Sequence, residues 1–190
     1  MNSMITDEKY AINPRKFTLW LLIVGMSMFF IAFISAYVVR RSEGNWEVFN
    51  LPSAFRLNVF VSIISSITIQ WAVWAAKRDE LNQIKIALFI TLVLGVFFCY
   101  SQLEGWKEMV ENNIRLVGGE TPSASFVYVI SGMHGLHVVG GIIYLIIMFI
   151  QSLRLNIHKT NLLQISMCRT YWHFVGVLWI ILYLFLLLNR

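Results

Sequence analysis

Hydrophobic residues run along this chain in five long stretches that short polar segments separate. The stretches cover about residues 17–39, 54–76, 84–103, 125–151 and 170–188. Roughly 20 helical residues cross the ~30 Å hydrocarbon core of a bilayer, and each stretch approaches or exceeds that length. Transmembrane β-strands would be about half as long and would alternate in polarity, which these stretches do not. The pattern therefore predicts an all-α, polytopic membrane protein built as a bundle of five transmembrane helices.

The same pattern sets the domain organisation. We expect a polar N-terminal segment at 1–16, followed by one five-helix transmembrane domain at 17–190. Polar residues precede the first stretch and Arg40 and Arg41 follow it, which argues against a cleaved signal peptide. The composition agrees, because 58% hydrophobic and 13% charged residues leave too little charge for the surface of a soluble domain.

The charged residues predict the orientation in the membrane. Segments 1–16, 77–85 and 152–169 would share one side and carry nine basic and four acidic residues, whereas the other side carries six of each. The positive-inside rule then places the N-terminus in the cytoplasm and the C-terminus outside. Because the excess of basic residues lies in the segments on one side of the membrane, the positive-inside rule explains it, and it does not indicate a nucleic-acid partner.

Each hydrophobic stretch carries small or polar residues at helical spacing. Lipid tails are as apolar as leucine, so helices in a membrane associate through close backbone approach and hydrogen bonds. We therefore expect these stripes to face other helices. The stripes are Gly25, Met28, Ala32 and Ser35; Asn58, Ser62 and Ser65; Thr91, Gly95, Phe98 and Gln102; Ser131, His134, His137 and Gly141; and His173, Gly176, Ile180 and Tyr183.

Histidine is the only chemically suggestive residue type within the hydrophobic stretches. Imidazole binds haem, copper and iron, and His134 and His137 lie three residues apart on one helix face. However, no carboxylate in the middle of a span joins them, and His173 begins a helix of opposite direction at a different depth. Cys99 and Cys168 would lie near opposite membrane faces, too far apart for a disulfide.

The sequence thus predicts no catalytic, cofactor-binding or metal-binding residue. It also offers no intramembrane charge of the kind that marks ion and proton paths. The polar residues are instead candidates for helix packing or lipid contacts. These candidates are His134, His137, His173, Trp172, Asn58 and Gln102.

Several motifs identify a family. Gly132-Met133-His134-Gly135-Leu136-His137-Val138 resembles a Gly-x-His-Gly-x-His-Val signature, and Tyr171-Trp172-His173-Phe174-Val175 resembles a Tyr-Trp-His-Phe-Val segment. Shorter matches, collinear with these, are Met28-Phe29-Phe30, Leu51-Pro52 with Asn58, and Gln102 with Trp106. Together they cover about residues 17–188 and resemble subunit III of the haem–copper respiratory oxidases, in a short five-helix bacterial form.

The resemblance implies a cofactor-free subunit of a bacterial terminal oxidase in the cytoplasmic (inner) membrane. Such a subunit packs against catalytic subunit I and supports stability, lipid binding and proton uptake during oxygen reduction. Haem and copper are expected in the partner subunits, and a bound phospholipid and a respiratory supercomplex are compatible with the resemblance.

Three features depart from the family pattern. Met26 stands where many members carry a membrane Glu, and Gly176 stands where members carry an Asp. The mitochondrial type has seven helices, of which this chain resembles the last five. Any role of the two carboxylates therefore does not transfer. The lipid cleft formed with the first two helices would need another subunit to supply its missing wall.

Three other interpretations stay open. The first is subunit III of a quinol oxidase, which the sequence discriminates poorly from a cytochrome c oxidase because the electron donor docks elsewhere. A small transporter or channel fits less well, because it would need intramembrane charge or broken helices. A membrane metalloenzyme using the three histidines fits least.

Overall fold

The computed structural model describes residues 13–44, 46, 48–114, 116, 122–154 and 162–189. Within these residues it contains five helices, and each is long and apolar enough to cross a membrane. They are α1 (Pro14–Ser42), α2 (Ser53–Lys77), α3 (Leu81–Glu111), α4 (Pro122–Leu153) and α5 (Leu163–Leu188). The prediction of an all-α membrane protein with five spanning helices is confirmed. Most of the predicted polar segment 1–16, like His158, lies outside the described residues.

The helices extend beyond the hydrophobic stretches because polar residues continue them into the aqueous boundary. Helix α1 begins inside the polar segment, where the Asn13 side chain accepts a hydrogen bond from the backbone N–H of Arg15 and Pro14 occupies the first turn. Its last turn carries Arg40 and Arg41, whose charge complements the negative end of the helix dipole.

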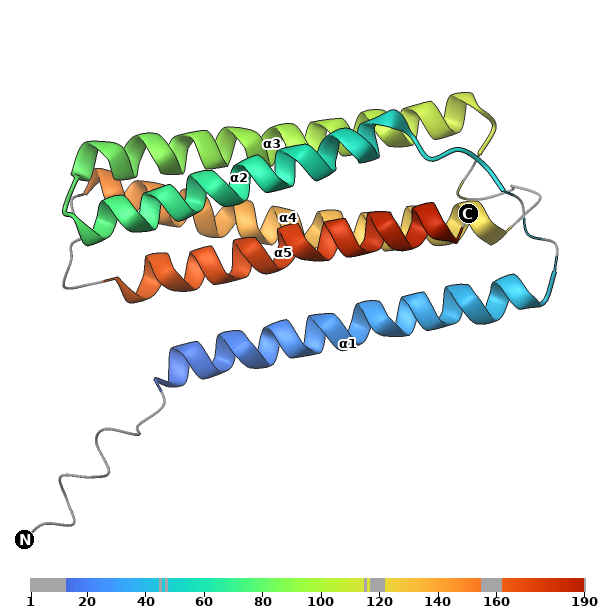
Figure 1. The fold of residues 1–190 in the computed structure, drawn as a ribbon, viewed down its shortest axis with the longest axis horizontal. Coiled ribbons are helices and arrows are strands. Elements are labelled where there is room, and N and C mark those ends of the chain that lie inside the picture. Colours follow the sequence, from blue (N-terminus) through green and yellow to red (C-terminus); the bar gives the residue numbers. More distant parts are fainter. Residues whose placement is uncertain are drawn as a thin grey trace, which may run out of the picture.

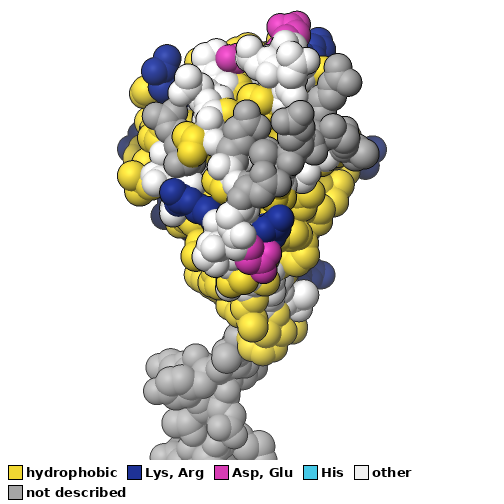
Figure 2. Space-filling view, turned by 90° about the vertical axis from the view of Figure 1, so that its right-hand side faces the viewer, with side chains coloured by type: hydrophobic (Ala, Val, Ile, Leu, Met, Phe, Trp, Pro, Cys, Tyr) yellow, Lys and Arg dark blue, Asp and Glu magenta, His cyan; other side chains and the backbone are white. Residues whose placement is uncertain are grey.

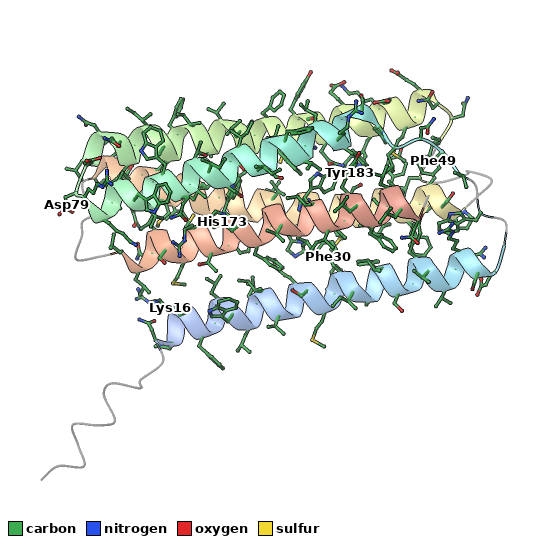
Figure 3. All side chains as sticks on the ribbon, viewed as in Figure 1. Lys16, Phe30, Phe49, Asp79, His173 and Tyr183 are labelled. Atoms are coloured by element: carbon green, nitrogen blue, oxygen red, sulfur yellow. The ribbon has the colours of Figure 1, made fainter. Side chains whose placement is uncertain are left out.

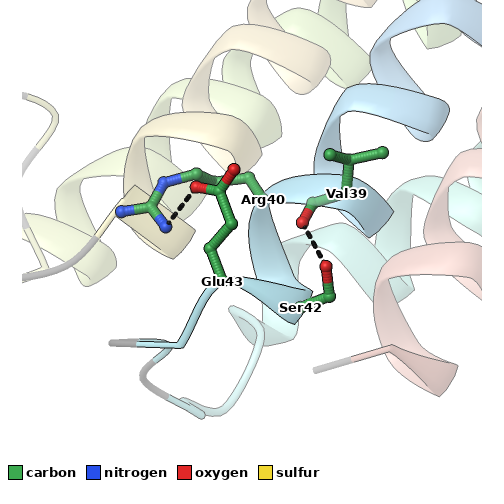
Figure 4. Close-up of polar contacts among 4 residues, drawn as sticks. All are labelled: Val39, Arg40, Ser42 and Glu43. Carbon is green, nitrogen blue, oxygen red and sulfur yellow. Dashed lines mark hydrogen bonds and ion pairs between the residues drawn. The ribbon is translucent and has the colours of Figure 1, made fainter.

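Local polar contacts also mark the end of α1. Arg40 forms a salt bridge with Glu43 at 3.0 Å, and the Ser42 hydroxyl donates to the Val39 carbonyl at 2.7 Å (Figure 4). These contacts are exposed, so their contribution to stability is at most about 1 kcal/mol. They define where the helix ends rather than how the bundle packs.

Helices α2, α3, α4 and α5 form a closed group of four, and α1 lies along one edge of it (Figure 1). The pair α2 and α3 packs most extensively, and contacts of α3 with α4, α4 with α5, and α5 with α2 complete the ring. Within the described residues, α1 packs on no helices other than α4 and α5. The core of the protein therefore lies inside the ring of four.

The first helix corrects one prediction from the sequence. Gly25, Met28, Ala32 and Ser35 do not face other helices of this chain; Met28 is 66% exposed, and no atom would lie within 4 Å of a Cβ placed on Gly25. The buried positions are Ile23, Met26, Phe30 and Tyr37. Large side chains fill the space between α1 and its neighbours, so α1 does not need small residues for close approach.

Charged side chains gather at the ends of the bundle, and apolar side chains cover its flanks. Figure 2 shows this for the end at which α1, α3 and α5 end and α2 and α4 begin. This distribution is the one expected of a protein whose flanks lie in lipid and whose ends lie in water.

Candidate functional site

Neutral polar side chains occupy the centre of the four-helix ring. Among the described residues, every buried polar side chain is uncharged. The buried polar residues are Asn58, Ser62, Ser65, Thr91, Ser101, Gln102, Ser123, Ser131, His134 and Ser152. Hydrogen-bonding groups in a membrane interior need partners, and several of these residues find theirs on a neighbouring helix.

Polar contacts at several levels join helices α2 and α3. The Asn58 amide donates to the Gln102 side-chain oxygen at 3.3 Å and approaches the Phe98 carbonyl at 3.4 Å. About three turns along, the hydroxyls of Thr68 and Thr91 lie 2.8 Å apart. The predicted contact residues Asn58 and Gln102 thus meet each other, with 0% and 3% of their surface exposed.

Trp172 of α5 inserts its indole ring between two glycines. A Cβ on Gly95 of α3 would lie 2.8 Å from the Trp172 ring, and a Cβ on Gly141 of α4 would lie 3.0 Å from it. The indole N–H donates to the Ser65 hydroxyl of α2 at 3.2 Å. One side chain therefore contacts all three other helices of the ring, and both glycines are needed to admit it.

His134 is fully inside the ring. Its Nε2 lies 3.1 Å from the Val175 carbonyl of α5, and only 1% of its surface is exposed. The carbonyl can only accept, so Nε2 carries the hydrogen and donates. The imidazole is flanked by Phe98 and Trp179, with ring centroids 5.6 and 4.9 Å away.

His137 makes a different kind of contact. Its Nδ1 donates to the Met133 carbonyl one turn back on its own helix, at 2.7 Å. The link to α5 comes instead from the backbone, because the Tyr171 hydroxyl donates to the His137 carbonyl at 3.0 Å. The imidazole of His137 therefore does not bond a neighbouring helix.

Phe30 connects α1 to the two histidines. Its ring centroid lies 5.6 Å from that of His137 and 6.5 Å from that of His134, and the side chain points from α1 toward the other helices (Figure 3). With 1% exposure, Phe30 is one of the most buried residues of α1. In the sequence, Phe30 stands out only as part of the Met28-Phe29-Phe30 motif.

The third histidine lies elsewhere. His173 of α5 lies next to α2 (Figure 3), where its Nε2 is 3.5 Å from the Gln70 side-chain oxygen. It lines a groove together with Ser66 and Trp74. His134, in contrast, binds α5 from the side of α4. Within the part of the chain that the structure describes, no three His, Cys, Asp or Glu side chains come together as metal ligands.

Trp179 and Trp106 are further residues that the sequence did not single out as helix contacts. Trp179 has 0% exposure and packs on His134, and the Trp106 indole donates to the Ser131 hydroxyl at 3.0 Å. Ser131 belongs to the stripe expected to face other helices, and its contact with Trp106 of α3 confirms that expectation. Nothing in the hydropathy pattern distinguishes a buried tryptophan such as Trp179 from one at a membrane interface.

The two positions where the resemblance expects carboxylates lie on different helices, α1 and α5. Met26 is buried on the inner face of α1. A Cβ on Gly176 would lie 3.3 Å from the Ser66 hydroxyl, so this position adjoins the groove between α2 and α5. The cysteines Cys99 and Cys168 are both free.

The sequence that forms this helical bundle matches one protein family over nearly the whole length of the chain. The sequence model of the family described as cytochrome c oxidase subunit III matches residues 7–189. The chain belongs to this family. The resemblance noted from the sequence motifs is thereby confirmed, and with it the expectation of a multi-pass membrane subunit of a respiratory oxidase.

Relatives within the cytochrome c oxidase subunit III family come from bacteria and from animals. The chain is 29% identical to a probable cytochrome c oxidase subunit 3 of Nocardia farcinica, over 94% of this chain and 91% of that one. It is 28% identical, with the same coverage, to the probable subunit 3 of Mycobacterium tuberculosis. The cytochrome c oxidase subunit 3 of Anopheles quadrimaculatus is 30% identical over 86% of this chain, but only 65% of its own length is covered.

Proposed function

We propose that this chain is the cofactor-free subunit III of a bacterial haem–copper terminal oxidase that reduces oxygen with electrons from cytochrome c. In this role it packs against catalytic subunit I in the cytoplasmic membrane and supports stability, lipid binding and proton uptake there. Haem and copper belong to the partner subunits. Other oxidase subunits, and in some membranes a respiratory supercomplex, complete its surroundings.

The family match over residues 7–189 carries this proposal. The chemistry of the described residues supports it. The fully buried histidine, His134, already uses Nε2 to bind a backbone carbonyl, and His137 uses Nδ1 in the same way. Neither pairs with His173, so the imidazoles serve packing rather than redox chemistry. The relatives' names favour cytochrome c over quinol as the electron donor.

The cofactor assignment is tested on the purified, isolated chain. We expect no haem Soret band, and no copper or iron at one per chain after treatment with a chelator, because the histidines do not converge on one site. Optical spectroscopy and elemental analysis are the measurements. One metal ion per chain that survives chelation would contradict this assignment and favour a membrane metalloenzyme.

The proposed orientation leads to a second expectation. The N-terminus should lie in the cytoplasm and the C-terminus outside. Nine basic residues lie in the segments on the same side of the membrane as the N-terminus, and six lie in the segments on the other side. Fusions of a cytoplasm-active and a periplasm-active reporter to each end measure this. If both ends reported the same side, the number of spans in the membrane would be even and the topology proposed here would be wrong.

A further inference from the structure

A small cavity lies at the centre of the four-helix ring. Its volume is about 20 Å³, and residues from all four helices line it, among them Ser62, Gly95, His134, Val175 and Trp179. Roughly 10–15 Å³ of such volume suffices for one water molecule, provided that two to four polar partners surround it. The cavity thus has room for one water, and its occupancy depends on the polar groups at its wall.

Two nitrogen atoms of residues in this wall have no hydrogen-bond partner among the described residues. They are Nδ1 of His134 and Nε1 of Trp179, and both are buried. Because His134 donates from Nε2 to Val175, its Nδ1 is an acceptor in the neutral imidazole. The indole Nε1–H can only donate. Within the described residues, Nδ1 of His134 therefore lacks a hydrogen-bond donor, and Nε1–H of Trp179 lacks an acceptor.

These two groups do not bond each other directly. The rings of His134 and Trp179 lie 4.9 Å apart between centroids and are inclined by 34°. The N–H of an indole and the lone pair of an imidazole both lie in the planes of their rings. Neither nitrogen has a hydrogen-bond partner in the described part of the chain, so a third group near their ring edges is needed to satisfy both.

We propose that this cavity binds one water molecule, which accepts a hydrogen bond from Trp179 Nε1–H and donates one to His134 Nδ1. The second hydrogen of the water is directed to the Ser62 hydroxyl oxygen. Ser62 donates its own hydrogen to the Val59 carbonyl at 2.8 Å, so its oxygen retains the capacity to accept. Three hydrogen bonds are typical of buried waters in proteins. The water thus links α2, α4 and α5 at the centre of the membrane domain.

The site can be tested by solid-state NMR on the full chain in lipid bilayers, with its four histidines labelled with ¹⁵N. The His134 signals are identified by their loss in His134→Gln. We expect His134 to carry its hydrogen on Nε2, and we expect magnetisation from water protons to reach the unprotonated Nδ1. Absence of this transfer in the wild type, or a hydrogen on Nδ1, would overturn the proposal.

A pair of conservative variants tests the bridge. Trp179→Phe keeps an aromatic ring but removes the donor, so the transfer from water to Nδ1 should fall severalfold or vanish. Trp74→Phe, at a position 54% exposed on the flank, should leave it unchanged. Transfer that stays at the wild-type level in Trp179→Phe would show that Trp179 does not hold the water. The wild-type measurement decides occupancy even if Trp179→Phe does not fold.

Discussion

Gly95→Ala is expected to destabilise the isolated chain by about 1–3 kcal/mol, the range for overpacking a tight interior. The added Cβ would lie 2.8 Å from the Trp172 ring, and it would also approach an Ile142 side-chain carbon at 3.3 Å. The indole cannot retreat without breaking its hydrogen bond to Ser65. Denaturation of the full chain in mixed micelles measures the free energy of unfolding.

Gly135→Ala is the matched control for this variant. Gly135 lies in the middle of α4, and nothing would lie within 4 Å of its Cβ. Both substitutions change helix propensity alike, so the difference between them reports the steric clash. Adding Trp172→Phe to Gly95→Ala removes the indole and should lessen the cost of the alanine. Equal stabilities of the Gly95 and Gly135 variants would show that the Trp172 pocket is not closely packed.

Removal of this chain from the purified oxidase should leave oxygen reduction active at first, and activity should then decline faster during turnover. The first expectation follows because the described residues hold no set of metal ligands. The second follows because a partner that binds the native state stabilises it, so its loss lowers the stability of the catalytic subunit. Oxygen uptake, recorded over many turnovers with and without this chain, measures both.

Reconstitution provides the control for the stripped oxidase. Returning the wild-type chain should restore the lifetime of activity, and returning Gly95→Ala should restore less of it, because less of that variant is folded. Immediate and complete loss of oxygen reduction, with subunit I still folded and loaded with haem, would contradict a supporting role. It would indicate that this chain takes part in the chemistry.

The number and type of the helices could be predicted because hydrophobic length is a direct consequence of bilayer thickness. The faces of α2, α3 and α4 that pack on other helices could also be predicted, because the polar side chains of Asn58, Gln102 and Ser131 have to avoid lipid. The face of α1 that packs on the other helices could not be predicted. Lipid and protein interior are equally apolar, so a buried Phe30 and an exposed Met28 look alike in the sequence.

The details of the site depend on how the helices are rotated about their axes. The spacing of His134 and His137 places them on one side of α4, but it does not show that one imidazole bonds across to α5 and the other bonds back to Met133. The pocket for Trp172 likewise requires glycines from two other helices at one level. Such coincidences arise only from the packed bundle.

One purification tests directly whether this chain is a cofactor-free subunit of a haem–copper oxidase. An affinity tag on this chain, in membranes solubilised with a mild detergent, should recover an assembly with a haem spectrum that responds to reduction. After dissociation, the haem absorbance should remain with the partner subunits. Recovery of the folded chain from its native membranes without any haem protein, or haem that stays with this chain, would contradict the account.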